Sequence, residues 1–128
     1  MKKIEVKPQF TDERGEIMDL LEKETIDAIT VITFTKGAVR ANHFHKKTTQ
    51  WNYLISGKVL IKGQKQGEKA EELIMKPGDF VVSETNEAHA LKALEKSTLM
   101  VFTKGPRGGK EYESDTFRLE KPLIPRDD

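Results

Sequence analysis

The sequence has no cysteine, only one tryptophan and two tyrosines, and only three histidines among its 128 residues. Without cysteine the chain can form neither a disulfide framework nor a thiolate zinc site. No stretch approaches the roughly 20 consecutive apolar residues that a membrane helix needs. Residues 1–7 include lysines with no apolar segment after them, which argues against a secretory signal. We therefore expect a soluble, cytoplasmic protein that makes no contact with a membrane.

The chain also lacks an excess of charge of either sign. Lysine and arginine together number 22, and aspartate and glutamate number 21, which leaves a formal net charge of +1. Such a balance provides no broad positive field to attract nucleic acid. The length suits a single hydrophobic core, so we expect residues 1–128 to form one domain with no nucleic-acid partner.

Short β-type segments dominate the chain. They are rich in β-branched and aromatic residues and comprise 28–34, 51–55, 58–62, 72–75, 80–82 and 97–102. Ser56-Gly57 predicts a tight hairpin between the second and third of these, and 63–71 has the composition of a polar hairpin loop. Residues 17–26 fit either a helical period or a strand and turn. The pattern indicates an all-β sandwich or barrel, followed from about residue 104 by a tail that either wraps the domain or frays.

The three histidines fall at spacings that indicate one site. His43 and His45 are one residue apart in a strand-like stretch, so both face the same side of the sheet. His89 comes after a Pro-Gly-Asp turn and begins another strand-like stretch. Imidazole is the commonest metal ligand and titrates nearest pH 7. Unless the pair merely lies exposed on a polar strand face, the three residues either hold a metal ion or move a proton.

The residues around this cluster are regularly spaced. Five, four and six residues separate the successive members of the series Gly37, His43-Phe44-His45, Gln50 and Gly57, and His89 is eleven positions after Gly78. Residues 37–57 and 77–93 thereby resemble the two motifs of the cupin superfamily. The resemblance implies an RmlC-like jelly roll, or double-stranded β-helix barrel. It also implies a homodimer, since such barrels usually pair through a sheet edge.

The cupin pattern brings four positions together inside the barrel, which implies a metal site of His43, His45, Gln50 and His89. The family's usual glutamate is Gln50 here, so the ligand set is neutral. A divalent ion (manganese, iron, nickel or zinc) would keep its full charge and could polarise a bound carbonyl or water. A neutral set also binds an ion less tightly than a set with a carboxylate, so a site without metal stays open.

A narrower resemblance joins three further stretches, 11–17, 40–47 and 112–118, to the deoxythymidine-diphosphate-sugar 3,4-ketoisomerases and epimerases of the cupin class. It implies a nucleotide-sugar substrate and no metal, with His43 or His45 as the base that removes a proton next to a carbonyl. Arg40 would hold the diphosphate through its guanidinium, and Lys46 is a weaker candidate for the same role. Ala41 stands where those enzymes have glycine, and no tyrosine comes before Arg40.

Two aromatic residues complete the candidate site. Trp51 and Tyr53 share one face of their strand and are candidates for substrate contact, with core or interface packing as the alternative. Phe44 points away from its histidine neighbours if the strand is regular.

Three functions are consistent with these patterns. The first is a cupin with a His/His/Gln/His metal site that acts on or binds a small carbohydrate-related molecule. The second is a metal-free sugar-nucleotide isomerase or epimerase. The third is a ligand-binding cupin without catalysis.

Overall fold

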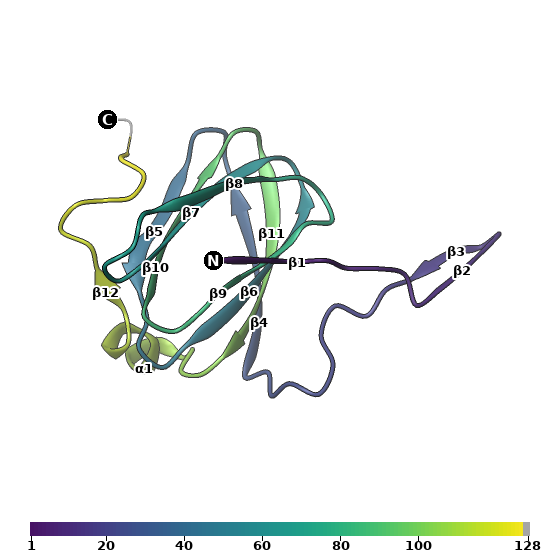
Figure 1. Ribbon diagram of the computed structural model, residues 1–128, viewed down its shortest axis with the longest axis horizontal. Helices are drawn as coiled ribbons and strands as arrows, with labels where there is room; N and C mark the ends of the chain where they lie inside the picture. Colours follow the sequence, from purple (N-terminus) through teal and green to yellow (C-terminus); the bar gives the residue numbers. More distant parts are fainter. Residues whose placement is uncertain (127–128) are drawn as a thin grey trace.

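The structure is a computed structural model that describes residues 1–126, and nearly all of its regular secondary structure is β-strand (Figure 1). The strands are β1 (Lys2–Ile4), β2 (Phe10–Asp12), β3 (Gly15–Ile17), β4 (Ala28–Phe34), β5 (Val39–Phe44), β6 (Thr49–Ser56), β7 (Val59–Lys65), β8 (Glu71–Met75), β9 (Phe80–Ser83), β10 (Glu87–Ala93), β11 (Ser97–Lys104) and β12 (Phe117–Arg118). One short helix, α1 (Gly109–Ser114), lies between β11 and β12. The all-β fold expected from the sequence is confirmed.

Two five-stranded antiparallel sheets form the body of the molecule and face each other (Figure 1). One has the strand order β1-β9-β6-β11-β4, and the other has the order β12-β5-β10-β7-β8. The side chains between the sheets form the main core, whose buried members are Phe34, Leu54, Val59, Ile61, Met75, Val81, Leu91, Ala93, Leu99 and Val101. Full burial of each larger aliphatic side chain contributes about 1.5–3 kcal/mol, so this layer holds the two sheets together.

The hairpin expected at Ser56-Gly57 is wrong. Strand β6 pairs with β9 and β11, whereas β7 pairs with β8 and β10, so the turn carries the chain from one sheet to the other. Gly57 has a φ of +94°, and a Cβ there would collide with Ser97 and the carbonyl oxygen of Lys96. A Ser-Gly turn between two apolar runs suits a hairpin and a crossover alike, because only long-range pairing distinguishes them.

The polar loop expected between 63 and 71 does join two paired strands, β7 and β8, but it is shorter because β7 continues to Lys65. The helical alternative for residues 17–26 is wrong, since most of this stretch is irregular chain. Its apolar residues Leu20, Leu21 and Ile26 pack on the outer face of the first sheet against a second cluster. That apolar spacing therefore reflects burial on a sheet and not a helical face.

The tail after β11 wraps the second sheet. Strand β12 pairs with β5, and the carbonyl oxygen of Asn42 accepts a hydrogen bond from the backbone N–H of Leu119. The side-chain amide of Asn42 makes two further bonds to the backbone of Ile124, at 2.9 and 3.1 Å. Ile124 is buried. The last two tail residues, 127 and 128, lie outside the described part of the chain. Within residues 1–126, no helix has the length and apolar character needed to cross a membrane.

Candidate metal and substrate site

The three histidines converge between the sheets. His43 lies near the end of β5, His45 follows directly after that strand, and His89 lies on the adjacent strand β10, opposite His43. The centroid of the His43 ring is 4.7 Å from the centroid of the His45 ring and also 4.7 Å from that of the His89 ring. One nitrogen from each imidazole can be chosen so that all three lie within 4.8 Å of one another. The single cluster expected from the spacing is therefore present in the fold.

A β-bulge in β5 shapes this part of the site. His43 is opposite His89 and Ala41 is opposite Ala90, so Asn42 is an extra residue between them. Ala41 and Asn42 both have positive φ angles, +72° and +59°. This conformation costs least for glycine, the residue that the resemblance to the ketoisomerases implies at the position of Ala41.

The bulge also decides where Arg40 lies. In a regular strand, Arg40 and His43 would face opposite sides of the sheet, because side chains alternate. One extra residue reverses that alternation, and Arg40 and His43 line the same cavity. The Arg40 guanidinium carbon is 5.2 Å from the centre of the Phe34 ring, and Nη2 donates to the carbonyl oxygen of Thr33.

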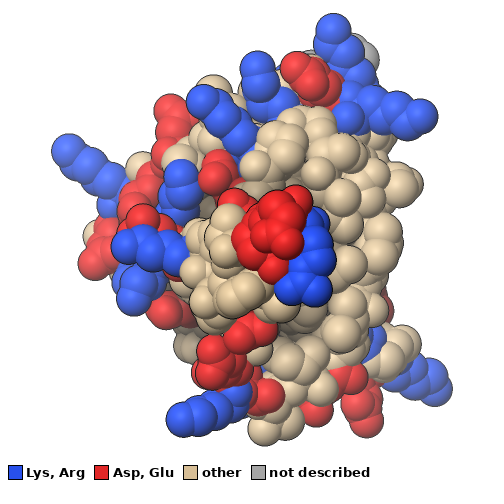
Figure 2. Space-filling view, turned by 90° about the vertical axis from the view of Figure 1, so that its right-hand side faces the viewer, with Lys and Arg blue, Asp and Glu red and all other residues tan. Residues whose placement is uncertain are grey.

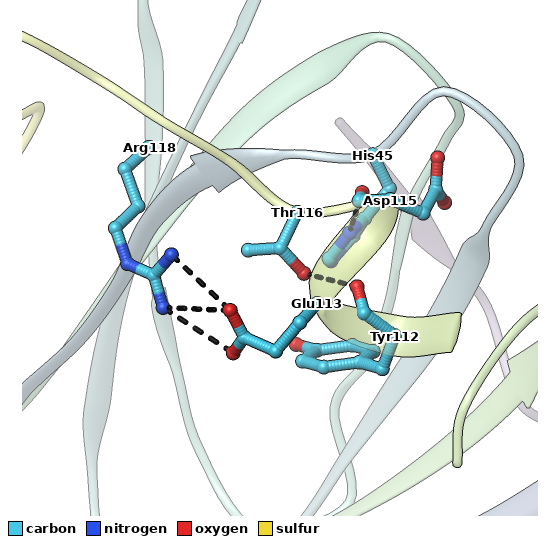
Figure 3. Close-up of polar contacts among 6 residues, drawn as sticks. All are labelled: His45, Tyr112, Glu113, Asp115, Thr116 and Arg118. Atoms are coloured by element: carbon cyan, nitrogen blue, oxygen red, sulfur yellow. Dashed lines mark hydrogen bonds and ion pairs between the residues drawn. The ribbon is translucent and has the colours of Figure 1, made fainter. Parts of the chain in front are cut away.

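His45 is held in one orientation by the C-terminal segment (Figure 3). Its Nδ1 is 2.8 Å from the backbone carbonyl oxygen of Asp115, and a dashed line marks this contact in Figure 3. A carbonyl oxygen only accepts, so Nδ1 carries the proton and Nε2 keeps its lone pair. The buried Nε2 has no hydrogen-bond partner in the structure. An imidazole that donates a hydrogen bond from one nitrogen to a carbonyl and keeps a lone pair on the other has the arrangement of a metal ligand.

The side chain of Asp115 fixes the loop that follows His45. Its carboxylate accepts hydrogen bonds from the backbone N–H groups of Lys46 and Lys47 and from the hydroxyl of Thr48. Burial alone would raise the pKa of Asp115, but the bonds from Thr48, Lys47 and Lys46 outweigh it and hold the pKa below its usual value. One residue thus anchors both the ring and the backbone of the segment that contains His45.

Burial keeps all three imidazoles neutral near pH 7. Desolvation, with a smaller contribution from the neighbouring His45, lowers the pKa of His43 to about 4. Desolvation likewise lowers the pKa of His45, and it lowers that of His89 well below 6.5, with the other two histidines adding to the effect. Neutral imidazoles are the form that binds metal, whereas a base that works near pH 7 needs a pKa closer to that value.

The cluster lies at a cavity of about 310 Å³ between the sheets. The lining residues are Ile32, Phe34, Arg40, Ala41, His43, Gln50, Asn52, His89, Leu91, Leu99, Val101, Arg107 and Tyr112. Gln50, the expected fourth ligand, is buried and reaches this cavity from β6. The residues expected to hold a metal are therefore brought together around one space, with His45 adjoining His43 and Tyr112.

A known protein family and a curated relative match part of this chain. A family model described as Cupin domain matches residues 30–103, more than half of the chain and a stretch that contains all three histidines. The chain belongs to the cupin family. Pectin degradation protein KdgF of Dickeya dadantii (strain 3937) is 31% identical over 78 residues, which are 59% of this cupin and 64% of that protein. The matched part is thus slightly less than two thirds of KdgF.

Solved structures of sugar-nucleotide enzymes share the fold. QdtA, a sugar 3,4-ketoisomerase from Thermoanaerobacterium thermosaccharolyticum in complex with TDP, superposes with a TM-score of 0.76 at 20% identity. The match covers 93% of this cupin and 88% of QdtA. The RmlC epimerase of Mycobacterium tuberculosis gives a TM-score of 0.71 at 16% identity, with 83% of this cupin and 64% of that chain covered. At these identities the likeness establishes the RmlC-like jelly-roll fold.

Three residues proposed from the sequence as substrate contacts lie away from the cavity lining. Trp51 and Tyr53 are on the face of β6 opposite Gln50, where they belong to the second apolar cluster with Phe80. Their packing on the outer face of the sheet is the alternative given above. The Lys46 ammonium is 4.3 Å from the centre of the Phe117 ring, outside the lining.

Other cavity residues were not expected from the sequence. Asn52 lines the cavity from β6, and its amide donates to the carbonyl oxygen of Val81 at 3.0 Å. Tyr112, on α1, has its ring centre 5.2 Å from that of His45, and Arg107 lies 4.4 Å above the Tyr112 ring. The match of residues 112–118 to the ketoisomerases was a usable signal for Tyr112, but nothing in the sequence marked Arg107.

Proposed function

We propose that this cupin binds a divalent metal ion through His43, His45, His89 and Gln50 and acts on a small carbohydrate-related molecule in the adjoining cavity. The observation that supports the metal is the buried Nε2 of His45, which has no partner although its ring is fixed by Asp115. An unsatisfied buried nitrogen costs about 1–3 kcal/mol, and a ligated ion removes that cost.

The donor set also fits such an ion. Imidazole nitrogens suit zinc, iron and nickel, and an amide oxygen is accepted by manganese as well. Bound there, the ion would act as a Lewis acid on a carbonyl or water of the ligand. Tyr112 places a phenol at the edge of the cluster, where its hydroxyl can donate a hydrogen bond to a bound sugar oxygen.

Two observations support a carbohydrate-related ligand. KdgF is a pectin degradation protein, QdtA is a 3,4-ketoisomerase of which a mutant was solved in complex with TDP-4-keto-6-deoxyglucose, and another structural neighbour is a dTDP-4-dehydrorhamnose 3,5-epimerase. The cavity of about 310 Å³ is at the small end of the range for ligand sites, roughly 300–1,000 Å³. A single sugar ring suits that space, whereas the nucleotide of a sugar nucleotide would have to lie outside it.

Elemental analysis tests the metal directly. Cells are grown with added manganese, iron, nickel and zinc, and the metal content of purified wild type is compared with that of His45→Ala and His89→Ala. We expect about one ion per chain in the wild type and near zero in both variants. Asn52→Ala is the matched control, because Asn52 lines the cavity but is outside the proposed ligand set, and it should keep its metal. A metal-free wild type after this growth would contradict the proposal.

A second candidate is a metal-free isomerase or epimerase of sugar nucleotides with His43 or His45 as base. The packing of the Tyr112 ring against His45 favours it, because a phenol and an imidazole can move protons on neighbouring carbons. The lowered pKa values of His43 and His45 weaken it. Turnover of deoxythymidine-diphosphate sugars by chelator-treated protein, lost in Arg40→Ala, would establish this function. Ligand binding with no turnover under any condition would indicate a binding protein.

The homodimer and the cytoplasmic location expected from the sequence stay proposals. The hairpin of β2 and β3 extends from the barrel in Figure 1 and exposes Phe10 and Ile17 by 50% and 60%. Figure 2, viewed from that end, shows a broad area without charged side chains beside the charged hairpin tip. Light scattering on Ile17→Glu, with Ile74→Glu on the opposite sheet as control, tests whether this end joins two copies.

A further inference from the structure

The cavity lining carries positive charge and, among residues 1–126, no carboxylate. Its charged members are Arg40 and Arg107, and its histidines are neutral near pH 7. A divalent ion would add two further charges. Unbalanced charge of one sign that lines a small cavity raises the local concentration of ligands of the opposite sign.

In the described part of the chain, two arginines outside the cavity have carboxylate partners, whereas the two that line it do not. Arg14 and Arg118, outside it, pair with Asp12 at 2.6 Å and with Glu113 at 3.3 Å. Figure 3 shows the fork between Arg118 and Glu113. No carboxylate within the described residues lies within ion-pair distance of Arg40 or Arg107. Each of these two rests on an aromatic ring instead, Arg40 on Phe34 and Arg107 on Tyr112.

Stacking on a ring orients a guanidinium and leaves its N–H groups available. The planar fork of arginine matches a carboxylate or phosphate, and such charge-assisted bonds are about twice as strong as neutral ones. Arg40 uses one nitrogen on the carbonyl oxygen of Thr33 and keeps others free. Both arginines thus have unused donors beside the space where a ligand would bind.

We infer that the cavity binds an anionic sugar, whose carboxylate or phosphate pairs with Arg107, with Arg40 contributing at the part of the cavity near Phe34. The inference rests on the proposed function for the identity of the ligand as a sugar and for its place in the cavity. The preference for an anion depends only on the two arginines. Arg107 is linked to the histidine cluster through Tyr112, because it stacks on the same Tyr112 ring that contacts His45. The limited volume favours an acidic group carried by the sugar itself.

Matched sugars separate the contribution of charge from that of shape. Calorimetry would compare glucuronate with glucose, which differ only in oxidation at C6, and would include glucose 1-phosphate as the phosphate probe. Each is titrated into metal-loaded and chelator-treated wild type, Arg107→Ala, Arg40→Ala and Arg118→Ala. We expect glucuronate or glucose 1-phosphate to bind wild type about ten- to a hundredfold more tightly than glucose. Which of the two binds more tightly distinguishes carboxylate from phosphate.

Arg107→Ala should remove most of this preference and Arg40→Ala part of it. Arg118→Ala, which removes an arginine already paired with Glu113, should keep it. Equal binding of glucose and both anions to wild type, absence of binding by all three, or an equal loss in Arg118→Ala would overturn the inference. So would a preference that vanishes in chelator-treated wild type, because the metal alone would then account for it.

The same titrations keep this inference separate from the metal proposal. Protein that contains no metal but still prefers anions through Arg107 would contradict the metal and leave the anion site established. Protein that holds metal but shows no preference for anions would support the metal site and contradict the anion site. Arg107→Lys, which keeps the charge and loses the fork, should recover only part of the preference.

Discussion

The two ends of the barrel interior are built on the same strands but perform different tasks. On β6 the inward side chains pass from Gln50 and Asn52, which line the cavity, to Leu54 in the main core. On β10 they pass from His89 to Leu91. The apolar end contributes burial energy, whereas the polar end presents imidazole and amide groups to the cavity, and burying these groups has a cost in stability. The apolar end therefore stabilises the strands that carry the polar residues of the cavity.

At the polar end of the interior, two buried polar atoms of the described residues have no hydrogen-bond partner. Asn52 and His45 have partners in Val81 and Asp115, but the buried Nε2 of His45 and the buried hydroxyl of Thr103, opposite Gln50, have none. Buried polar atoms are nearly always hydrogen-bonded in native proteins, so the unpaired Nε2 of His45, beside the other two histidines, is consistent with a bound group there.

The largest expected effect is at the apolar end. Leu54→Ala removes a fully buried side chain and should lower the free energy of unfolding by about 2–5 kcal/mol, measured by urea denaturation. Leu54→Met, which keeps the volume, should cost less than about 1.5 kcal/mol. Metal content should be the same in both folded variants. A loss of metal in Leu54→Ala under conditions where it is folded would show that the two ends are not independent.

Asp115→Ala should affect both stability and metal binding. Its carboxylate accepts bonds from the backbone of Lys46 and Lys47 and from Thr48, so we expect a loss of about 1–3 kcal/mol in stability. Misplacement of the His45 ring should weaken metal binding about 10- to 100-fold, as other supporting residues do. Asp79→Ala is the control, since Asp79 accepts from Lys76 in a distant turn and should leave metal affinity unchanged. Equal metal affinity in Asp115→Ala and wild type would remove Asp115 from the site.

Gln50→Glu should give opposite results with and without metal. A buried carboxylate without a partner should destabilise the chelator-treated protein by about 1–3 kcal/mol, whereas with metal the negative charge should tighten ion binding. Thermal unfolding with and without added zinc measures both. Asn52→Asp puts a carboxylate in the same cavity at a position outside the proposed ligand set. It should show only the loss of stability, without tighter binding of the ion. If zinc rescues the two variants equally, Gln50 is not a ligand.

The smallest effect is the pH dependence of the metal-free protein. The pKa of His43 is lowered from 6.5 to about 4, so the unfolded chain binds more protons than the folded chain between these values. Stability should therefore be complete above about pH 6.5 and should fall as the pH drops towards about 4, by about 1 kcal/mol by pH 5 after allowing for solvent screening. Urea midpoints at several pH values measure it, and His43→Gln should flatten the profile. A midpoint that rises on acidification would contradict the buried, neutral state of the cluster.

Most predictions that depend on neighbouring residues were right, whereas several that depend on contacts between distant parts of the chain were wrong or missing. Residues 28–34 formed the expected strand because alternation and β-branching are local properties. The His43, His45 and His89 cluster was expected because its spacing matched a family pattern. The hairpin at Ser56-Gly57 was wrong, since pairing across sheets depends on residues far away in the chain. Arg107 was missed because the loop that carries it has no local pattern.

The sequence by itself predicted most of the β-strands and the grouping of the three histidines with Gln50, because both predictions depend on residue type and on short spacings along the chain. Tertiary structure alone decided which face Arg40 presents, because one extra residue at Asn42 reverses the alternation of β5. It also brought Tyr112 and Arg107 to the cavity, since the C-terminal segment is held there by long-range bonds to His45 and to the loop after it. The proposed metal ligands could thus be anticipated from the sequence, whereas the positive charge of the cavity beside them arises from the way the chain folds back on itself.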